Sequence, residues 1–119
     1  QLEKSWAWPK PVQKPHPPII LGGAVGKKTA RHIAEFCDGW MPLGRYGDIK
    51  KGISLIQDAA AEIGRDLSDF ETSMFCVTPI KKDKIAKLSE QGLTRLILPL
   101  PAEDEISVLP ILDEYSALI

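Results

Sequence analysis

Four short apolar runs alternate along the chain with segments whose apolar residues recur at helical spacing. The runs are continuous rather than alternating, which is typical of strands that are covered on both faces. They lie at residues 19–21, 40–43, 71–78 and 95–101. Because each run precedes a helical segment, the pattern predicts an α/β fold of four βα units with parallel strands.

The helical segments are bounded by stop signals. They cover residues 26–37, 48–63, 83–91 and 103–118. Asp38 with Gly39, Gly64 and Gly92 are expected to end the first three helices, because glycine tolerates the backbone that closes a helix. Pro110 is expected to bend the last helix or to mark a late start.

Residues 1–18 differ from the rest because five of them are proline, which removes backbone donors and excludes a helix. We expect an extended, polyproline-like arm over residues 1–18, followed by one domain over residues 19–119. Trp6 and Trp8 have two interpretations: they pack the arm onto the domain, or they line a substrate pocket.

Composition narrows the function classes. The 119 residues suffice for one domain but fall short of the about 250 residues of a complete (β/α)8 barrel. The net charge of -1 gives no argument for binding nucleic acid or an anionic membrane. No apolar stretch approaches the ~20 residues of a membrane helix, and no signal peptide is recognisable. Cys37 and Cys76 lie in apolar surroundings without CxxC spacing, which indicates buried free thiols. We therefore expect a cytoplasmic protein without a metal site.

The first apolar run breaks into glycines directly before a helix. Residues 22–26 are Gly22, Gly23, Ala24, Val25 and Gly26. Glycines allow a ligand to approach the backbone closely, and the unpaired N–H groups of a first helical turn attract anions, so this stretch is a candidate phosphate site. A tight turn without a ligand is the alternative.

Other candidates are fewer. Arg45 follows the second run at the same edge of the sheet, where its guanidinium is suited to a phosphate or carboxylate, although an exposed loop arginine is commonly only solvated. Neither GxGxxG nor GxxxxGK[ST] is present, and no Ser-His-Asp or Cys-His arrangement can be assembled, so the catalytic residues stay unknown. Four βα units form either a small doubly wound sheet or half of a (β/α)8 barrel, and periodicity does not separate the two.

Several stretches resemble the bacterial luciferase-like monooxygenase family, with the best match in its deazaflavin-dependent branch. The most specific is the proline-rich entry into two glycines at residues 8–23, and the others are residues 30–34, 38–40, 59–66 and 92–101. The resemblance implies that the chain is the C-terminal half of a (β/α)8 TIM barrel. It also implies an oxidoreductase or monooxygenase that uses FMN or coenzyme F420 on a small organic substrate.

Carried over by position, the resemblance assigns cofactor-phosphate contacts to residues 22–25, with Gly26 beginning the helix. The groups near the flavin ring come from the other half of such a barrel. A half-barrel exposes open strand edges and an apolar interior, so we expect an N-terminal half-barrel or a second copy of the chain to complete it, the latter as a homo-oligomer. The alternatives are a non-catalytic, flavodoxin-like module for a phosphorylated ligand and an inactive remnant.

Overall fold

Strands and helices alternate through the chain. The structure is a computed structural model, which describes residues 3–6, 8–43 and 48–118. The elements are β1 (Ile20–Gly22), α1 (Lys27–Phe36), β2 (Gly39–Met41), α2 (Ile49–Glu62), β3 (Glu71–Phe75), α3 (Lys82–Glu90), β4 (Arg95–Ile97) and α4 (Glu105–Ser116). The predicted α/β class with four βα units is confirmed.

All four strands belong to one parallel sheet in the order β1-β2-β3-β4. A doubly wound sheet reverses its strand order at a switch point, whereas a barrel adds each new strand beside the last. The sequential order therefore separates the two folds that periodicity left open. It corresponds to half of a (β/α)8 barrel and not to a flavodoxin-like sheet.

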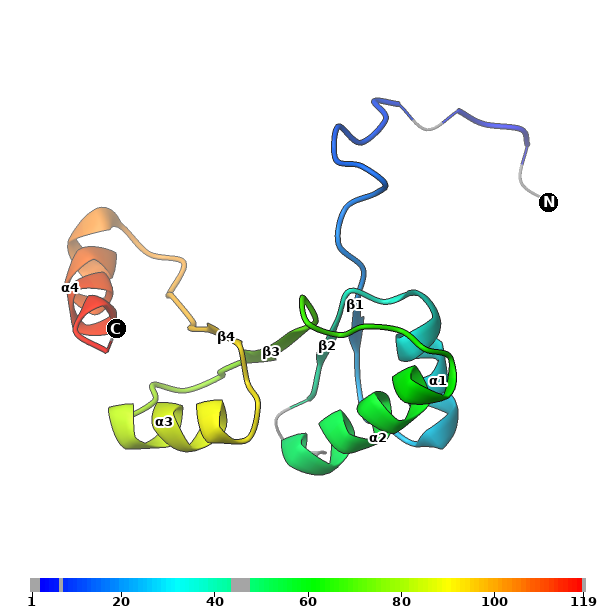
Figure 1. The fold of residues 1–119 in the computed structure, drawn as a ribbon. Coiled ribbons are helices and arrows are strands. Elements are labelled where there is room, and N and C mark those ends of the chain that lie inside the picture. Colours follow the sequence, from blue (N-terminus) through cyan, green and yellow to red (C-terminus); the bar gives the residue numbers. More distant parts are fainter. Residues whose placement is uncertain (1–2, 7, 44–47, 119) are drawn as a thin grey trace.

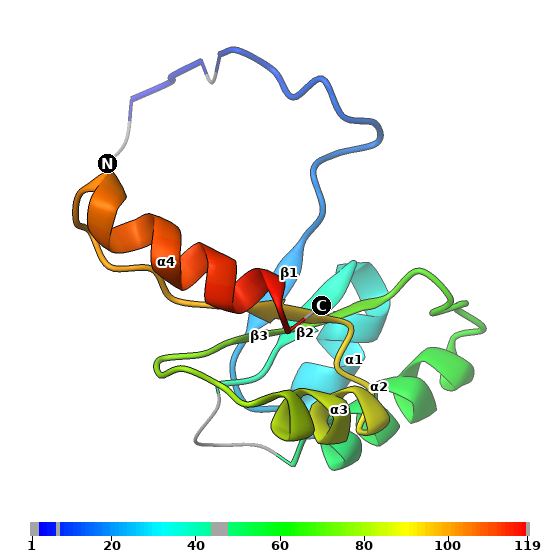
Figure 2. The same ribbon diagram turned by 90° about the vertical axis from the view of Figure 1, so that its left-hand side faces the viewer.

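Helices α1, α2 and α3 cover one face of this sheet (Figure 1, Figure 2). Leu21 and Trp40 pack there with the buried residues of α1 and α2, and Met74 packs with those of α3. Because side chains alternate along a strand, Ile20, Ser73 and Phe75 lie on the opposite face, which we call the inner face. In a closed barrel this is the side that points to the barrel axis.

The two ends of the chain lie away from this body. Helix α4 stands apart from the other helices, beyond β4, and is tied back by a bond from the Tyr115 hydroxyl to the carbonyl of Pro99 (2.9 Å). The proline-rich arm extends away from the sheet in both views (Figure 1, Figure 2). Trp6 and Trp8 are 86% and 70% exposed, so neither packs onto the domain, whereas their role in lining a substrate pocket stays a prediction.

The element boundaries differ from the expected ones where proline intervenes. β2 ends before Pro42 and β4 ends before Pro99, because proline has no N–H to continue the ladder. Pro110 lies inside α4, which begins at Glu105, so it does not mark a late start. Among the described residues, no helix is both long and apolar enough to cross a membrane.

Candidate functional site

The loop from β1 to α1 brings together the glycines that the sequence singled out. Gly22 is the last residue of β1, and Gly26 is the N-cap of α1. Gly23 has φ +137°, a backbone conformation that residues with a side chain rarely adopt. A Cβ atom built on any of these three glycines would meet nothing within 4 Å. Among the described residues, none fills the space beside the backbone of this loop, which is the space a ligand would need.

Within residues 3–6, 8–43 and 48–118, no side chain caps the N-terminus of α1. The cap residue makes no side-chain hydrogen bond, and the first turn contains no acidic residue. The intrahelical ladder starts with the bond from the Ala30 N–H to the Gly26 carbonyl (2.8 Å), so the N–H groups before Ala30 have no acceptor in the helix. Such an end favours an anion through both its N–H groups and its dipole.

The lysines of this first turn lie near acidic residues of the next helix. Lys27 and Lys28 line a groove between α1 and α2 together with Asp58 and Glu62 of α2. Their charges therefore have acidic neighbours on the outer surface of the molecule.

Two residues of β2 hold the loop in place. The indole N–H of Trp40 donates to the carbonyl of Gly23 (2.8 Å), and the N–H of Gly23 donates to the carbonyl of Met41 (3.0 Å). Trp40 is 1% exposed. The sequence analysis placed Trp40 only within a strand and missed this contact, because a bond between residues 17 apart leaves no local pattern.

Arg45, the other predicted site residue, lies outside the described residues. The neighbouring residues show only that α2 starts after it with a side-chain cap, in which Asp48 accepts from the N–H of Lys51 (3.2 Å). The role of Arg45 stays a prediction.

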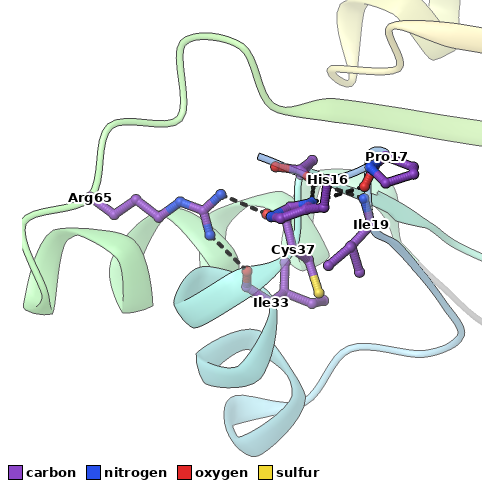
Figure 3. Close-up of polar contacts among 7 residues, drawn as sticks. His16, Pro17, Ile19, Ile33, Cys37 and Arg65 are labelled. Atoms are coloured by element: carbon purple, nitrogen blue, oxygen red, sulfur yellow. Dashed lines mark hydrogen bonds and ion pairs between the residues drawn. The ribbon is translucent and has the colours of Figure 1, made fainter. Parts of the chain in front are cut away.

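Polar residues also gather at the opposite end of the strands, as Figure 3 shows. The guanidinium of Arg65 donates to the carbonyls of Ile33 (3.3 Å) and Cys37 (2.7 Å). The Asp38 carboxylate accepts from the N–H of Ile19 (2.7 Å) and lies 3.9 Å from the His16 ring. The Arg65 contacts hold the C-terminal end of α1, and the Asp38 contacts hold the end of the proline-rich arm. Because barrel enzymes work at the carboxyl ends of their strands, this cluster belongs to the stability of the fold.

The inner face carries a polar cluster that the sequence analysis did not identify. Arg95 of β4 pairs with Glu71 of β3 (2.8 Å), and the Ser73 hydroxyl bonds to the same carboxylate. These three residues lie on strands predicted as apolar runs. Parallel register brings them together, since Ser73 lies directly beside Arg95.

Neither cysteine has the surroundings of a reactive thiol. Burial raises the pKa of both Cys37 and Cys76 above the usual range, and the nearby charges of Arg65 and Lys84 offset this only in part. Both are free and buried. Among the residues that the structure describes, no group of three His, Cys, Asp or Glu side chains is placed to hold a metal ion.

Comparison with known proteins agrees with this arrangement. Residues 3–106 match the family described as luciferase-like monooxygenase. An uncharacterized protein of Mycobacterium bovis and two of Mycobacterium tuberculosis are each 40% identical over 97 residues, which is 82% of this chain. The chain spans about a third of the length of these relatives, 33% in each case. With its parallel βα units in sequential order and this match over most of its length, the chain belongs to the luciferase-like monooxygenase family.

Proposed function

We propose that this chain provides the phosphate end of the cofactor site in an FMN- or F420-dependent oxidoreductase. The family is one of oxidoreductases that generally use flavin or F420 cofactors. Both cofactors carry a phosphate group, and both place their ring system at some distance from it. The proposal assigns the phosphate to residues 22–26.

The observation that carries the proposal is the open space at the glycine loop. No described residue lies within 4 Å of a Cβ built at Gly22, Gly23 or Gly26, and no side chain in the described part of the chain caps the helix that starts there. The loop lies at the carboxyl end of β1, which is the end of a barrel strand where ligands bind. The chemistry and the position both fit an anionic group.

In this proposal the chain's own residues bind and orient. The N–H groups that begin α1 donate to the phosphate oxygens, and the lack of a side chain at Gly23 lets the loop backbone lie close to them. The bound cofactor would supply the hydride or oxygen chemistry through its ring. The residues of this chain fix the end of the cofactor that does not react, which keeps its ring in one position relative to a small organic substrate.

The proposal also requires a closed barrel. We propose that the inner face is covered by an N-terminal half-barrel or by a second copy of the chain. Phe75, on that face, is 50% exposed in the chain taken alone. A covering half would bury it and would bring the residues that surround the ring.

The test is a titration of the protein, expressed from its complete reading frame, with FMN and F420 and with the corresponding phosphate-free compounds. Wild type should bind a phosphorylated cofactor more tightly than its phosphate-free form. Gly23→Ala should weaken phosphorylated-cofactor binding by about tenfold or more, because it displaces N–H groups whose bonds to a charged group are worth ~1.5–3 kcal/mol each. Binding of the phosphate-free form should change far less.

Gly64→Ala is the matched control. Gly64 also has a positive φ, +69°, and open space around it, but it ends α2 at the other end of the molecule. Both substitutions strain the backbone, so both should lower stability. An equal loss of cofactor affinity in the two variants would contradict the proposal, as would a folded wild type that does not distinguish the phosphorylated from the phosphate-free forms.

A further inference from the structure

The glycine loop is attached to the core through one buried side chain. Trp40 donates its indole N–H to the Gly23 carbonyl, and the next residue of β2 accepts the Gly23 N–H. The two peptide groups that flank the Gly23 Cα are therefore held by consecutive residues of one strand. Since Trp40 is 1% exposed, water does not compete strongly for the indole bond.

The indole itself has no room to turn. It packs in the cluster that includes Ile33 and Ile56, and Gly52 of α2 lies against its six-membered ring. A Cβ atom at Gly52 would overlap the ring, approaching Cζ3 to 2.6 Å. The direction of the indole N–H is thus fixed by packing between β2 and α2, elements outside the loop.

This fixed direction determines how the loop presents its donors. The carbonyl of one residue and the N–H of the next point in opposite directions across a planar trans peptide. Because the Gly23 carbonyl is turned toward Trp40, on the helix-covered face of the sheet, the N–H of Ala24 is turned away from the helices. It faces the side on which a ligand of the closed barrel would lie.

We propose that Trp40 is a positioning residue for the cofactor phosphate: its indole N–H fixes the Gly23 peptide so that the Ala24 N–H donates to a phosphate oxygen. This inference rests on the proposed function, since it assumes a phosphate at residues 22–26. Trp40 itself does not touch the ligand. Its effect reaches the phosphate through the orientation of one peptide group.

The test compares Trp40→Phe with wild type, using FMN against riboflavin, and F420 against its phosphate-free deazaflavin core. Phenylalanine retains an aromatic ring and removes the N–H. We expect affinity for the phosphorylated cofactor to fall about fivefold, the effect of losing one ordinary hydrogen bond. Affinity for the phosphate-free compound should stay within about twofold.

Ile56→Val is the matched control, because Ile56 is equally buried in the same cluster and has no polar group that could hold the loop. If Trp40 had a purely structural role, its substitution would change the affinity for both compounds equally, as we expect for Ile56→Val, which removes one methyl group from the core. If Trp40→Phe fails to fold, 3-benzothienylalanine at position 40 retains both rings, lacks the N–H and should show the same selective loss.

Two results would overturn the inference about Trp40, and only the second would also overturn the proposed function. If Gly23→Ala selectively weakens the phosphorylated cofactor but removal of the Trp40 N–H does not, the loop binds phosphate without help from Trp40. If neither substitution changes the preference for the phosphorylated form, the phosphate does not lie at residues 22–26, and the proposed function fails with the inference.

Discussion

At the scale of single residues, the contact between Gly52 and Trp40 shows how a position can reverse an ordinary preference. Gly52 lies inside α2, where alanine is normally the better helix former by about 1 kcal/mol. Here the Trp40 ring occupies the place of a side chain. The absence of a Cβ is therefore a packing requirement.

We predict that Gly52→Ala lowers the free energy of unfolding by about 1–2 kcal/mol, because overpacking a buried site costs more than helix propensity returns. Denaturant unfolding followed by circular dichroism measures the change. Ser54→Ala, at an exposed position of the same helix, should leave the stability equal or slightly higher. A stabilising Gly52→Ala would show that the ring moves freely.

At the scale of elements, the end of α1 depends on a side chain from a distant connector. The sequence predicted that Asp38 and Gly39 stop this helix, but Gly39 is the first residue of β2, in an extended strand. The carbonyls at the helix end are instead satisfied by Arg65, which donates to Ile33, Ala34 and Cys37. The predicted end of the helix before Asp38 is confirmed, but closure by a glycine is wrong, because a side chain from elsewhere in the fold satisfies these carbonyls.

Arg65→Lys should lower the free energy of unfolding by about 2 kcal/mol, because an ammonium group cannot reproduce three bonds made by a planar guanidinium. Arg31→Lys provides the comparison. Arg31 is exposed, and its one ion pair among the described residues is with Glu35 of the same helix (3.3 Å), so its replacement should change stability by less than ~0.5 kcal/mol. Equal effects at the two positions would mean that the Arg65 contacts contribute little.

The N-terminus of α4 should respond to pH. Asp104 caps this helix by accepting from the N–H of Ser107 (3.0 Å), and this bond lowers the pKa of the carboxyl below its ordinary 3.8. A lowered pKa in the folded state means that the carboxylate stabilises the fold above the ordinary value. The contribution is lost as the pH falls through the folded-state pKa.

We therefore predict that Asp104→Ala is less stable than wild type near neutral pH, and that this difference becomes smaller as the pH falls below 3.8. Asp104→Asn retains a capping oxygen but does not titrate, so its difference from Asp104→Ala should persist in acid. Urea unfolding at a series of pH values measures both differences. A difference between wild type and Asp104→Ala that does not depend on pH would contradict this account.

What could be predicted from the sequence follows from how local each signal is. Helices, strands and the glycine loop have periodicity or turn residues within a few positions, and they were found in the right order. The bonds of Trp40 to Gly23 and of Arg65 to Cys37 join residues 17 and 28 apart. Contacts of this kind depend on how strands align, and they leave no pattern along the chain.

At the scale of the whole molecule, the inner face has the properties of a barrel interior. Ile20 and Phe75 lie on it beside the ion pair of Glu71 with Arg95, and the Arg95 side chain is 63% exposed in the chain taken alone. Burial of this face would therefore have to cover apolar side chains and also offer further acceptors to Arg95. A covering surface with both features is what the second half of a barrel would provide.

Two phenylalanines of equal exposure allow this closure to be tested. Phe75, on the inner face, is 50% exposed, and Phe36, at the end of α1, is 53% exposed. In a closed barrel Phe75→Asp places an unpaired charge in the interior, which costs about 3 kcal/mol or more, whereas Phe36→Asp stays in water and changes stability by less than ~0.5 kcal/mol.

The measurement is thermal unfolding of the protein expressed from its complete reading frame, together with its mass by light scattering. If two copies complete the barrel, Phe75→Asp should also reduce the mass in solution from that of two copies of the protein to that of one. Equal and small effects of the two substitutions would mean that the inner face stays open to solvent, which a barrel does not allow.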